Sequence, residues 1–131
     1  MIPDRIIEQG TLTSDGSRAS VEVRIPWYRA LPASCISGAT LTIDGVTAPA
    51  DSLRWEMNGR SRTFAEMVDD TESWWFPLDS AVLSGDLAID PGAEHEVAVD
   101  LTLFIPYIVI GDGEVLHIDE HDAKTMKAVA A

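Results

Sequence analysis

Residues 94–105, EHEVAVDLTLFI, carry the most regular pattern in the chain. Apolar side chains occupy alternate positions of this stretch, at Val97, Val99, Leu101, Leu103 and Ile105. A period of two is typical of a β-strand with one buried face, because successive side chains point to opposite sides of a sheet. We therefore expect residues 94–105 to form a central strand of the core.

Two shorter alternating runs end in dipeptides that favour tight turns. The run 40–43 leads into Asp44-Gly45, and the run 53–57 leads into Asn58-Gly59. Both dipeptides tolerate positive φ, which a type I′ hairpin turn requires. The return strands are expected at residues 46–48 and 61–65.

The other segments show similar short patterns separated by turns. Residues 6–12 and 18–25 flank the turn-forming sequence SDGS at 14–17 and predict a hairpin. Residues 66–77 predict a short helical turn or a long loop carrying aromatics, and residues 81–89 predict a bulged strand, or a loop and a strand. Together these patterns predict an all-β fold, namely a β-sandwich or jelly-roll-like single domain with little helix.

The length of the chain suits one domain. With 131 residues it can bury a core but is too short for two ordinary domains. We place the β-sandwich domain at residues 1–113 and expect residues 114–131 to be a C-terminal segment, mobile or docked on a partner. The start of the sequence has no pattern of a signal peptide, and Cys35 is the single cysteine, so we expect a cytoplasmic protein.

The charge balance argues against two classes of partner. The chain has 22 acidic and nine basic residues, which leaves a formal net charge of −13. Such a charge repels the phosphates of nucleic acids and the anionic surface of membranes. In addition, no apolar run approaches the roughly 18 residues needed to span a bilayer. We therefore expect neither nucleic-acid binding nor membrane binding.

Aromatic side chains gather where predicted strands end. The sequence RIPWYRALP at residues 24–32 brings Trp27, Tyr28 and Arg29 between two prolines, which cannot donate ladder hydrogen bonds. These side chains either close the end of the sandwich or recognise a partner, because rigid aromatics and arginine dominate protein interfaces. The same two interpretations apply to Trp74 and Trp75. A shorter version of the motif, FIPY, ends with Tyr107 and is expected to close the strand that begins at residue 94.

No catalytic or metal-binding residue is assigned in this chain. His117 and His121 would share one face of a helix as metal ligands do, but nothing indicates a helix there. His95 is interpreted as an ordinary residue at the surface or at a strand edge. The carboxylates of Asp69, Asp70 and Glu72 precede Trp74 as an acid pair of a glycosidase might, yet proximity in sequence does not supply the required separation. Common motifs for nucleophiles and phosphate binding are absent from the sequence.

The sequence RIPWYRALPAS at residues 24–34 resembles the signature of the small β subunit of bacterial C-glycoside deglycosidases. The Asp44-Gly45 turn and the FIPY sequence at 104–107 stand at matching places, and IPDRII at 2–7 is similar to the start of that family. The resemblance covers most of the chain but little after Gly111. The sequence departs from the family at Ala30 and Ala33, where larger or polar residues are expected in some members.

The resemblance implies a β-sandwich subunit that assembles with a TIM-barrel α subunit in a hetero-oligomer. The α subunit of such an enzyme holds a divalent metal, expected to be manganese, and the catalytic residues. The complex cleaves, by elimination, the C–C bond of 3-oxo-C-glycosides of flavonoids or related phenols. This chain would then be the non-catalytic subunit, inactive when isolated, with the substrate at or near the interface. The residues expected to face the partner or substrate are Trp27, Tyr28, Arg29, Trp74, Trp75 and Tyr107.

Two other classes of function remain open from the sequence. A free-standing carbohydrate-binding β-sandwich module would stack a sugar on Trp27, Trp74 or Trp75. A small cupin-like metalloenzyme would need clustered histidines on strands. The spacing of the three histidines does not supply that cluster.

Overall fold

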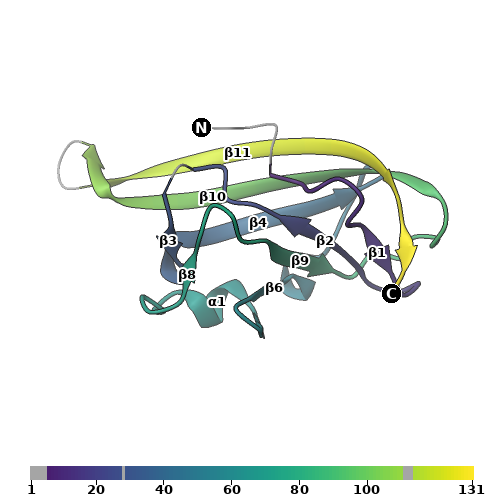
Figure 1. Cartoon of the computed structure of the whole chain (residues 1–131), viewed down its shortest axis with the longest axis horizontal. Coiled ribbons are helices and arrows are strands. Elements are labelled where there is room, and N and C mark those ends of the chain that lie inside the picture. The colour runs from purple at the N-terminus through teal and green to yellow at the C-terminus, as the bar shows by residue number, and fades with distance from the viewer. Residues whose placement is uncertain (1–5, 28, 111–113) are drawn as a thin grey trace.

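The computed structural model describes residues 6–27, 29–110 and 114–131, and the side chains of these residues except at 106–110, 114 and 115. Nearly all regular structure in this part of the chain is β (Figure 1). The strands are β1 (Thr13–Ser14), β2 (Ala19–Val23), β3 (Leu31–Pro32), β4 (Ile36–Ile43), β5 (Val46–Thr47), β6 (Arg54–Met57), β7 (Arg60–Arg62), β8 (Trp74–Trp75), β9 (Ala81–Gly85), β10 (Glu94–Ile110), β11 (Glu114–Lys127) and β12 (Val129–Ala130). The helices are the 3₁₀ turns η2 (Ala33–Cys35) and η3 (Ala50–Ser52) and the α-helix α1 (Phe64–Met67).

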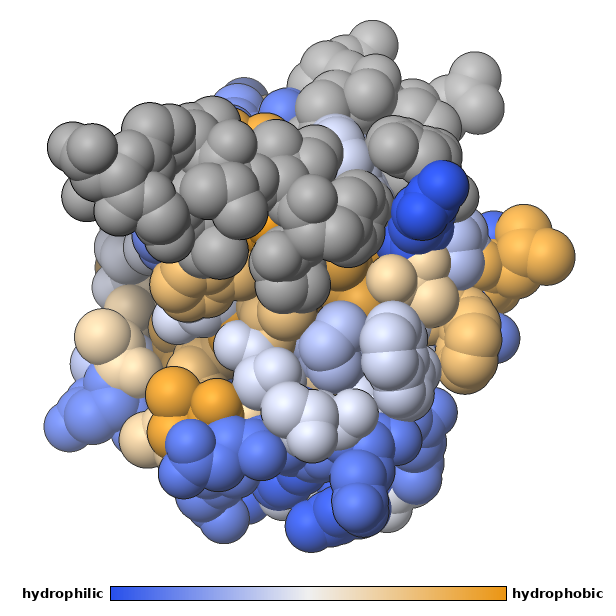
Figure 2. Space-filling model, turned by 90° about the vertical axis from the view of Figure 1, so that its left-hand side faces the viewer, coloured by the Kyte–Doolittle hydropathy of each residue, from blue (hydrophilic) through white to orange (hydrophobic). Residues whose placement is uncertain are grey.

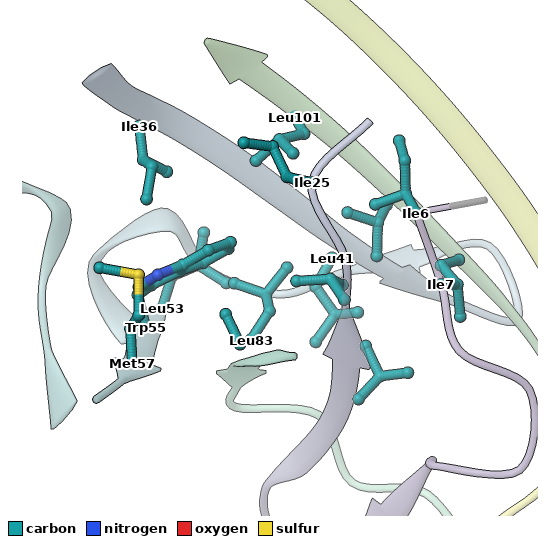
Figure 3. Packing of buried hydrophobic residues seen from close by; sticks show 14 of the residues in the cluster. Ile6, Ile7, Ile25, Ile36, Leu41, Leu53, Trp55, Met57, Leu83 and Leu101 are labelled. Carbon is teal, nitrogen blue, oxygen red and sulfur yellow. The ribbon is translucent and has the colours of Figure 1, made fainter. Parts of the chain in front are cut away.

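The strands form two large sheets and one small one. The six-stranded sheet has the order β12-β1-β2-β9-β6-β7, and the four-stranded sheet has the order β11-β10-β4-β5. The two large sheets enclose one cluster of buried apolar side chains (Figure 3). The two-stranded sheet, β3-β8, lies at one end of this sandwich (Figure 1). The predicted all-β class is confirmed, and none of the described helices is long and apolar enough to cross a membrane.

Strand β10 occupies the central position predicted for residues 94–105. It pairs with β11 on one side and with β4 on the other, both antiparallel. All five of its alternate apolar side chains are buried, from Val97 to Ile105. They face Leu83 and Trp55 of the opposite sheet within a single core, and Cys35 is buried with them. The period of two therefore determined correctly which face of this strand is inside.

Both hairpin turns have the predicted backbone. Asp44 and Gly45 have φ of 52° and 80°, and Asn58 and Gly59 have φ of 55° and 77°. Positive φ at both central residues is the signature of a type I′ turn. The first turn joins β4 to β5 and the second joins β6 to β7, each as an antiparallel pair.

The strand expected at residues 61–65 is shorter in the structure and ends three residues earlier. Strand β7 ends at Arg62, and α1 begins at once after Thr63. The Thr63 hydroxyl accepts the N–H of Glu66 at 3.3 Å, while a carboxylate oxygen of Glu66 accepts the N–H of Thr63 at 2.9 Å. This reciprocal pair of hydrogen bonds is a capping box, which the sequence spacing Thr-x-x-Glu predicts.

Pro106 does not end β10, contrary to our expectation for the FIPY sequence. The strand continues to Ile110. Pairing with β4 stops at Leu103, so the following residues have β11 as a neighbour on one side only. The β10–β11 register also shifts between Ile105 and Val109. A proline is compatible with a strand at such an edge or irregularity, because no ladder hydrogen bond is required of its nitrogen.

The C-terminal segment is an integral part of the sheets. Strand β11 pairs with β10 from Glu114 to Lys127 and extends along its whole length (Figure 1). Strand β12 lies parallel to β1, and the buried Asp122 accepts the backbone N–H of Ile7 at 2.9 Å. The boundary that we placed at residue 113 is therefore not a boundary of the fold. The mobile or partner-docked segment expected at residues 114–131 is instead two strands of this chain.

Candidate functional site at the aromatic end

The two aromatic segments of the sequence lie side by side at one end of the sandwich, which we call the aromatic end and define as residues 26–27, 29–34 and 68–80. Strands β3 and β8 pair Leu31 with Trp75 and Pro32 with Trp74. The contact continues past the strands, because the N–H of Ala33 donates to the carbonyl of Ser73 at 2.8 Å. Segments about 40 residues apart in the chain thus form one surface.

The adjacent tryptophans of β8 face opposite ways. Trp75 is fully buried, with its ring edge-to-face against Trp55 at a centroid distance of 4.9 Å. Its indole N–H donates to the carbonyl of Asp79 at 2.9 Å. Trp74 is 41% exposed. Trp75 therefore belongs to the core and cannot face a partner, whereas Trp74 can.

The loop that precedes β3 also carries one buried and one exposed side chain. Trp27 is buried, so the expectation that it faces a partner is wrong, and it closes the end of the sandwich instead. Arg29 is exposed on the same loop. Tyr28 lies outside the described residues, and so does the side chain of Tyr107, although the backbone at 107 belongs to β10. Of the six expected surface residues, Arg29 and Trp74 are the two whose side chains the structure places at the surface.

These positions also weaken the interpretation as a carbohydrate-binding module. That function would need tryptophan rings as stacking platforms. Trp27 and Trp75, two of the three candidates, are buried in the core. Trp74 alone offers part of its surface.

Asp70 organises the loop that carries Trp74. Its Oδ2 accepts a hydrogen bond from Nη1 of the buried Arg62 at 2.6 Å, and its Oδ1 accepts the backbone N–H groups of Glu72 and Ser73 at 2.9 and 3.0 Å. Its carbonyl accepts the N–H of Ser34, which ties the loop to η2. The hydrogen bond from Arg62, followed by those from the two backbone N–H groups, holds the pKa of Asp70 far below its ordinary range. The ion pair with Arg62 and the two backbone hydrogen bonds therefore give Asp70 a structural role in this loop.

Arg62 was missed by the sequence analysis. It lies opposite Trp55 in the β6–β7 hairpin and is 6% exposed. Its Nε and Nη2 and the indole nitrogen of Trp55 are buried without a hydrogen-bond partner among the described residues. A two-residue Asn-Gly turn fixes this register, so the sequence does indicate that Arg62 and Trp55 share a face. What it does not indicate is Asp70, which comes from a loop beyond the hairpin.

Large apolar side chains stand exposed at the aromatic end. Trp74, Phe76 and Leu78 are 41%, 51% and 81% exposed, and Val68, just after α1, is 64% exposed. Figure 2 looks at this end of the molecule, where orange and pale side chains cross the middle of the face above a blue, hydrophilic region. Exposed apolar surface of this kind is typical of a binding site for another protein.

The three histidines do not cluster with one another in the described part of the chain. His117 and His121 lie on the strand β11, so they are about 13 Å apart at the usual ~3.3 Å per residue. The ring of His117 packs on Phe104, and Nδ1 of His121 lies 2.7 Å from Asp100. Among the described residues, no three His, Cys, Asp or Glu side chains are grouped so that they could hold a metal ion.

His95 is buried, although we expected it at the surface or at a strand edge. Its Nδ1 lies 2.6 Å from a carboxylate oxygen of Asp44, and its Nε2 lies 2.9 Å from the carbonyl of Asp90. The hydrogen bond to Asp44, and then that to Asp90, raise the pKa of His95. The same hydrogen bond, followed by one from the N–H of Glu96, lowers the pKa of Asp44. His95 therefore joins the β4–β5 turn to the start of β10 and has a structural role.

Comparison with known proteins assigns the chain to a family. A family model described as C-glycoside deglycosidase beta subunit matches residues 7–107. A protein of Microbacterium trichothecenolyticum named "C-glycoside deglycosidase beta subunit" is 72% identical over 131 residues, covering 100% of both chains. One of Arthrobacter globiformis with the same name is 69% identical over 128 residues, 97% of each chain.

A more distant relative has a more specific name. The "3'-dehydrocarminate deglycosidase beta subunit" of a Microbacterium species is 39% identical over 127 residues, which are 96% of this chain and 95% of that one. The residues matched by the family model include the whole aromatic end. By these similarities, the chain belongs to the C-glycoside deglycosidase beta subunit family.

Proposed function

We propose that this chain is the small, non-catalytic subunit of a heteromeric C-glycoside deglycosidase. The observation that carries the proposal is the similarity, over 100% of the chain, to a protein named as the beta subunit of such an enzyme. A beta subunit implies an α subunit, which we propose to be a TIM-barrel protein that holds the catalytic residues and a divalent metal, manganese. The complex would be cytoplasmic.

The proposed reaction cleaves the C–C bond between a 3-oxo sugar and a flavonoid or related phenol. The 3-keto group acidifies the neighbouring sugar C–H, and a base of the α subunit would remove this proton. The C–C bond would then break with its electron pair passing to the aglycone carbon, which takes up a proton, while a double bond forms between the two sugar carbons. The metal would stabilise the negative charge of the enolate. One relative is named "3'-dehydrocarminate deglycosidase beta subunit", and this name supports an oxidised sugar as the substrate.

The contribution of this chain would be to bind and position. The described side chains place exposed aromatic and arginine residues at one end of the sandwich, and such residues dominate interface energetics. We propose that Arg29 and Trp74 face the α subunit, with the substrate at or near this interface. Tyr28 and Tyr107 belong to the same proposal, since both lie in the sequence motifs that resemble the family.

Co-expression with the α subunit tests this function. We expect the two chains to elute as one complex and to release aglycone from a 3-oxo-C-glycoside, while the isolated small chain releases none. Size-exclusion chromatography and detection of the free phenol provide the two measurements. Full activity of the isolated chain, or its failure to join the α subunit, would overturn the proposal.

A further inference from the structure

We propose that Trp74, Phe76 and Leu78, here called the apolar strip, insert into an apolar recess of the α subunit whose rim carries lysine or arginine. This inference rests on the proposed function, because that function supplies the partner. It names the surface that makes the contact and the chemistry of the surface that receives it.

The apolar strip runs from β8 into the turn that follows it. Trp74, Phe76 and Leu78 are exposed, whereas Trp75 between them is fully buried and Pro77 is half-buried. The pairing of β8 with β3 places Trp75 inside and Trp74 outside, and the turn after β8 leaves Phe76 and Leu78 at the surface. Exposed apolar side chains in the rest of the described chain are isolated, as Val46 is on β5 and Val129 on β12.

Three hydrogen bonds hold the backbone of the apolar strip in place. The indole N–H of Trp75 donates to the carbonyl of Asp79, and the N–H of Asp79 donates to the carbonyl of Phe76 at 2.9 Å. The side-chain amide of Asn58 donates to the carbonyl of Trp74 at 3.3 Å. A segment that is already ordered loses less conformational entropy on binding, which favours a tight complex.

The charges around the apolar strip define the partner. Asp69, Glu72 and Asp79 are exposed within a few residues of it and form no ion pair with described residues. A second copy of this chain would bring the same acidic rim, and a net charge of −13, against the first. Like charges placed across an interface are unfavourable, so self-association through this surface is disfavoured. A different protein, whose binding surface has a rim of basic residues, is complementary in charge to the apolar strip's surroundings.

The test uses variants that add one negative charge at apolar positions that are all more than half exposed. Leu78→Asp and Phe76→Asp change the apolar strip, and Val46→Asp and Val129→Asp are matched controls. The affinity of each variant for the α subunit is measured by titration calorimetry. We expect the first two to weaken binding by about tenfold or more, as interface anchors do, and the controls to bind like the wild type.

Two further measurements complete the test. The melting temperature of each isolated variant should match that of the wild type, because all four side chains are more than half exposed. Phe76→Ala should also weaken binding, which shows that apolar contact is required and not only the absence of a charge. If the strip variants bind as well as the controls, the inference is overturned while the proposed function stands. If the wild type itself does not bind the α subunit, the inference and the proposed function are both overturned. If the isolated chain is a dimer and Leu78→Asp makes it monomeric, the surface is assigned to a second copy of the chain.

Discussion

Trp74 and Trp75 show how much depends on the direction of a single side chain. Their identity and neighbourhood could be taken from the sequence, and so could the fact that one of two adjacent strand residues faces inwards. Which one faces inwards is decided by the pairing of β8 with β3 and by the ring of Trp55. Those contacts come from residues distant in the chain, so local periodicity over two residues could not settle the question.

Replacing these two tryptophans should therefore have opposite effects. Trp75→Ala leaves a cavity in the core and is expected to lower the free energy of unfolding by about 3–5 kcal/mol. Trp74→Ala should lower the free energy of unfolding by clearly less, because its side chain is 41% exposed, and should weaken binding to the α subunit. Urea unfolding of the isolated chain measures the first effect, and calorimetric titration with the α subunit measures the second. Equal losses of stability in both variants would contradict the assigned orientations.

The hydrogen bond between His95 and Asp44 makes stability depend on pH. Because folding raises the pKa of His95 above its ordinary 6.5, its contribution is complete below that value and is lost as pH rises through the raised pKa. Folding lowers the pKa of Asp44 below its ordinary 3.8, so its contribution is present above that value and is lost as pH falls through the lowered pKa. The pair should stabilise the fold most between pH 3.8 and 6.5.

Urea unfolding at about pH 5.5 and about pH 8.5 checks this dependence. The wild type should have the higher midpoint at the lower pH, and His95→Gln should reduce the difference. His121→Gln, on the exposed face of β11, is the matched control and should keep it. An unchanged difference in His95→Gln would show that other groups are responsible.

At the scale of elements, regular structure was predictable where its cause is local. The hairpin turns follow from Asp-Gly and Asn-Gly, and β10 follows from a long alternating run. Strand β11 was missed because its inward face changes from apolar to charged, with Glu120, Asp122 and Lys124 opposite the apolar face of β10. The buried carboxylate of Asp122 accepts hydrogen bonds from Lys124 and from the N–H of Ile7. Ile7 lies 115 residues away in the sequence.

Strand β9 contains a glycine that packing requires. A Cβ atom at Gly85 would lie 2.7 Å from the Cβ of Ala48 and 3.1 Å from Cδ2 of Leu53, although the backbone does not require glycine there. Gly85→Ala is expected to lower the free energy of unfolding by about 1–3 kcal/mol. Adding Ala48→Gly should restore part of this loss. Gly38→Ala, whose Cβ would meet nothing within 4 Å, is the matched control in urea unfolding and should be nearly neutral.

For the whole molecule, the acidic charge gives assembly a measurable signature. If the rim of Asp69, Glu72 and Asp79 meets basic residues of the α subunit, salt must screen the attraction. The affinity of the wild type should fall as the salt concentration rises from about 50 mM to about 500 mM. The triple variant Asp69→Asn, Glu72→Gln, Asp79→Asn should bind more weakly at low salt and depend less on salt. A wild-type affinity independent of salt would show that the rim does not take part.

The pairing of the two ends of the chain has a consequence for biosynthesis. Strand β1 is hydrogen-bonded to β12, and Ile7 is hydrogen-bonded to Asp122, so these residues obtain one of their partners from a segment made about 115 residues later. A ribosome adds about 5–20 residues per second, and many domains begin to fold while synthesis continues. Strand β1 can pair with β2 early, but its pairing with β12 and the hydrogen bond of Ile7 to Asp122 form only after residues 122–130 have been made. The six-stranded sheet is therefore completed late, once these residues have left the ribosome.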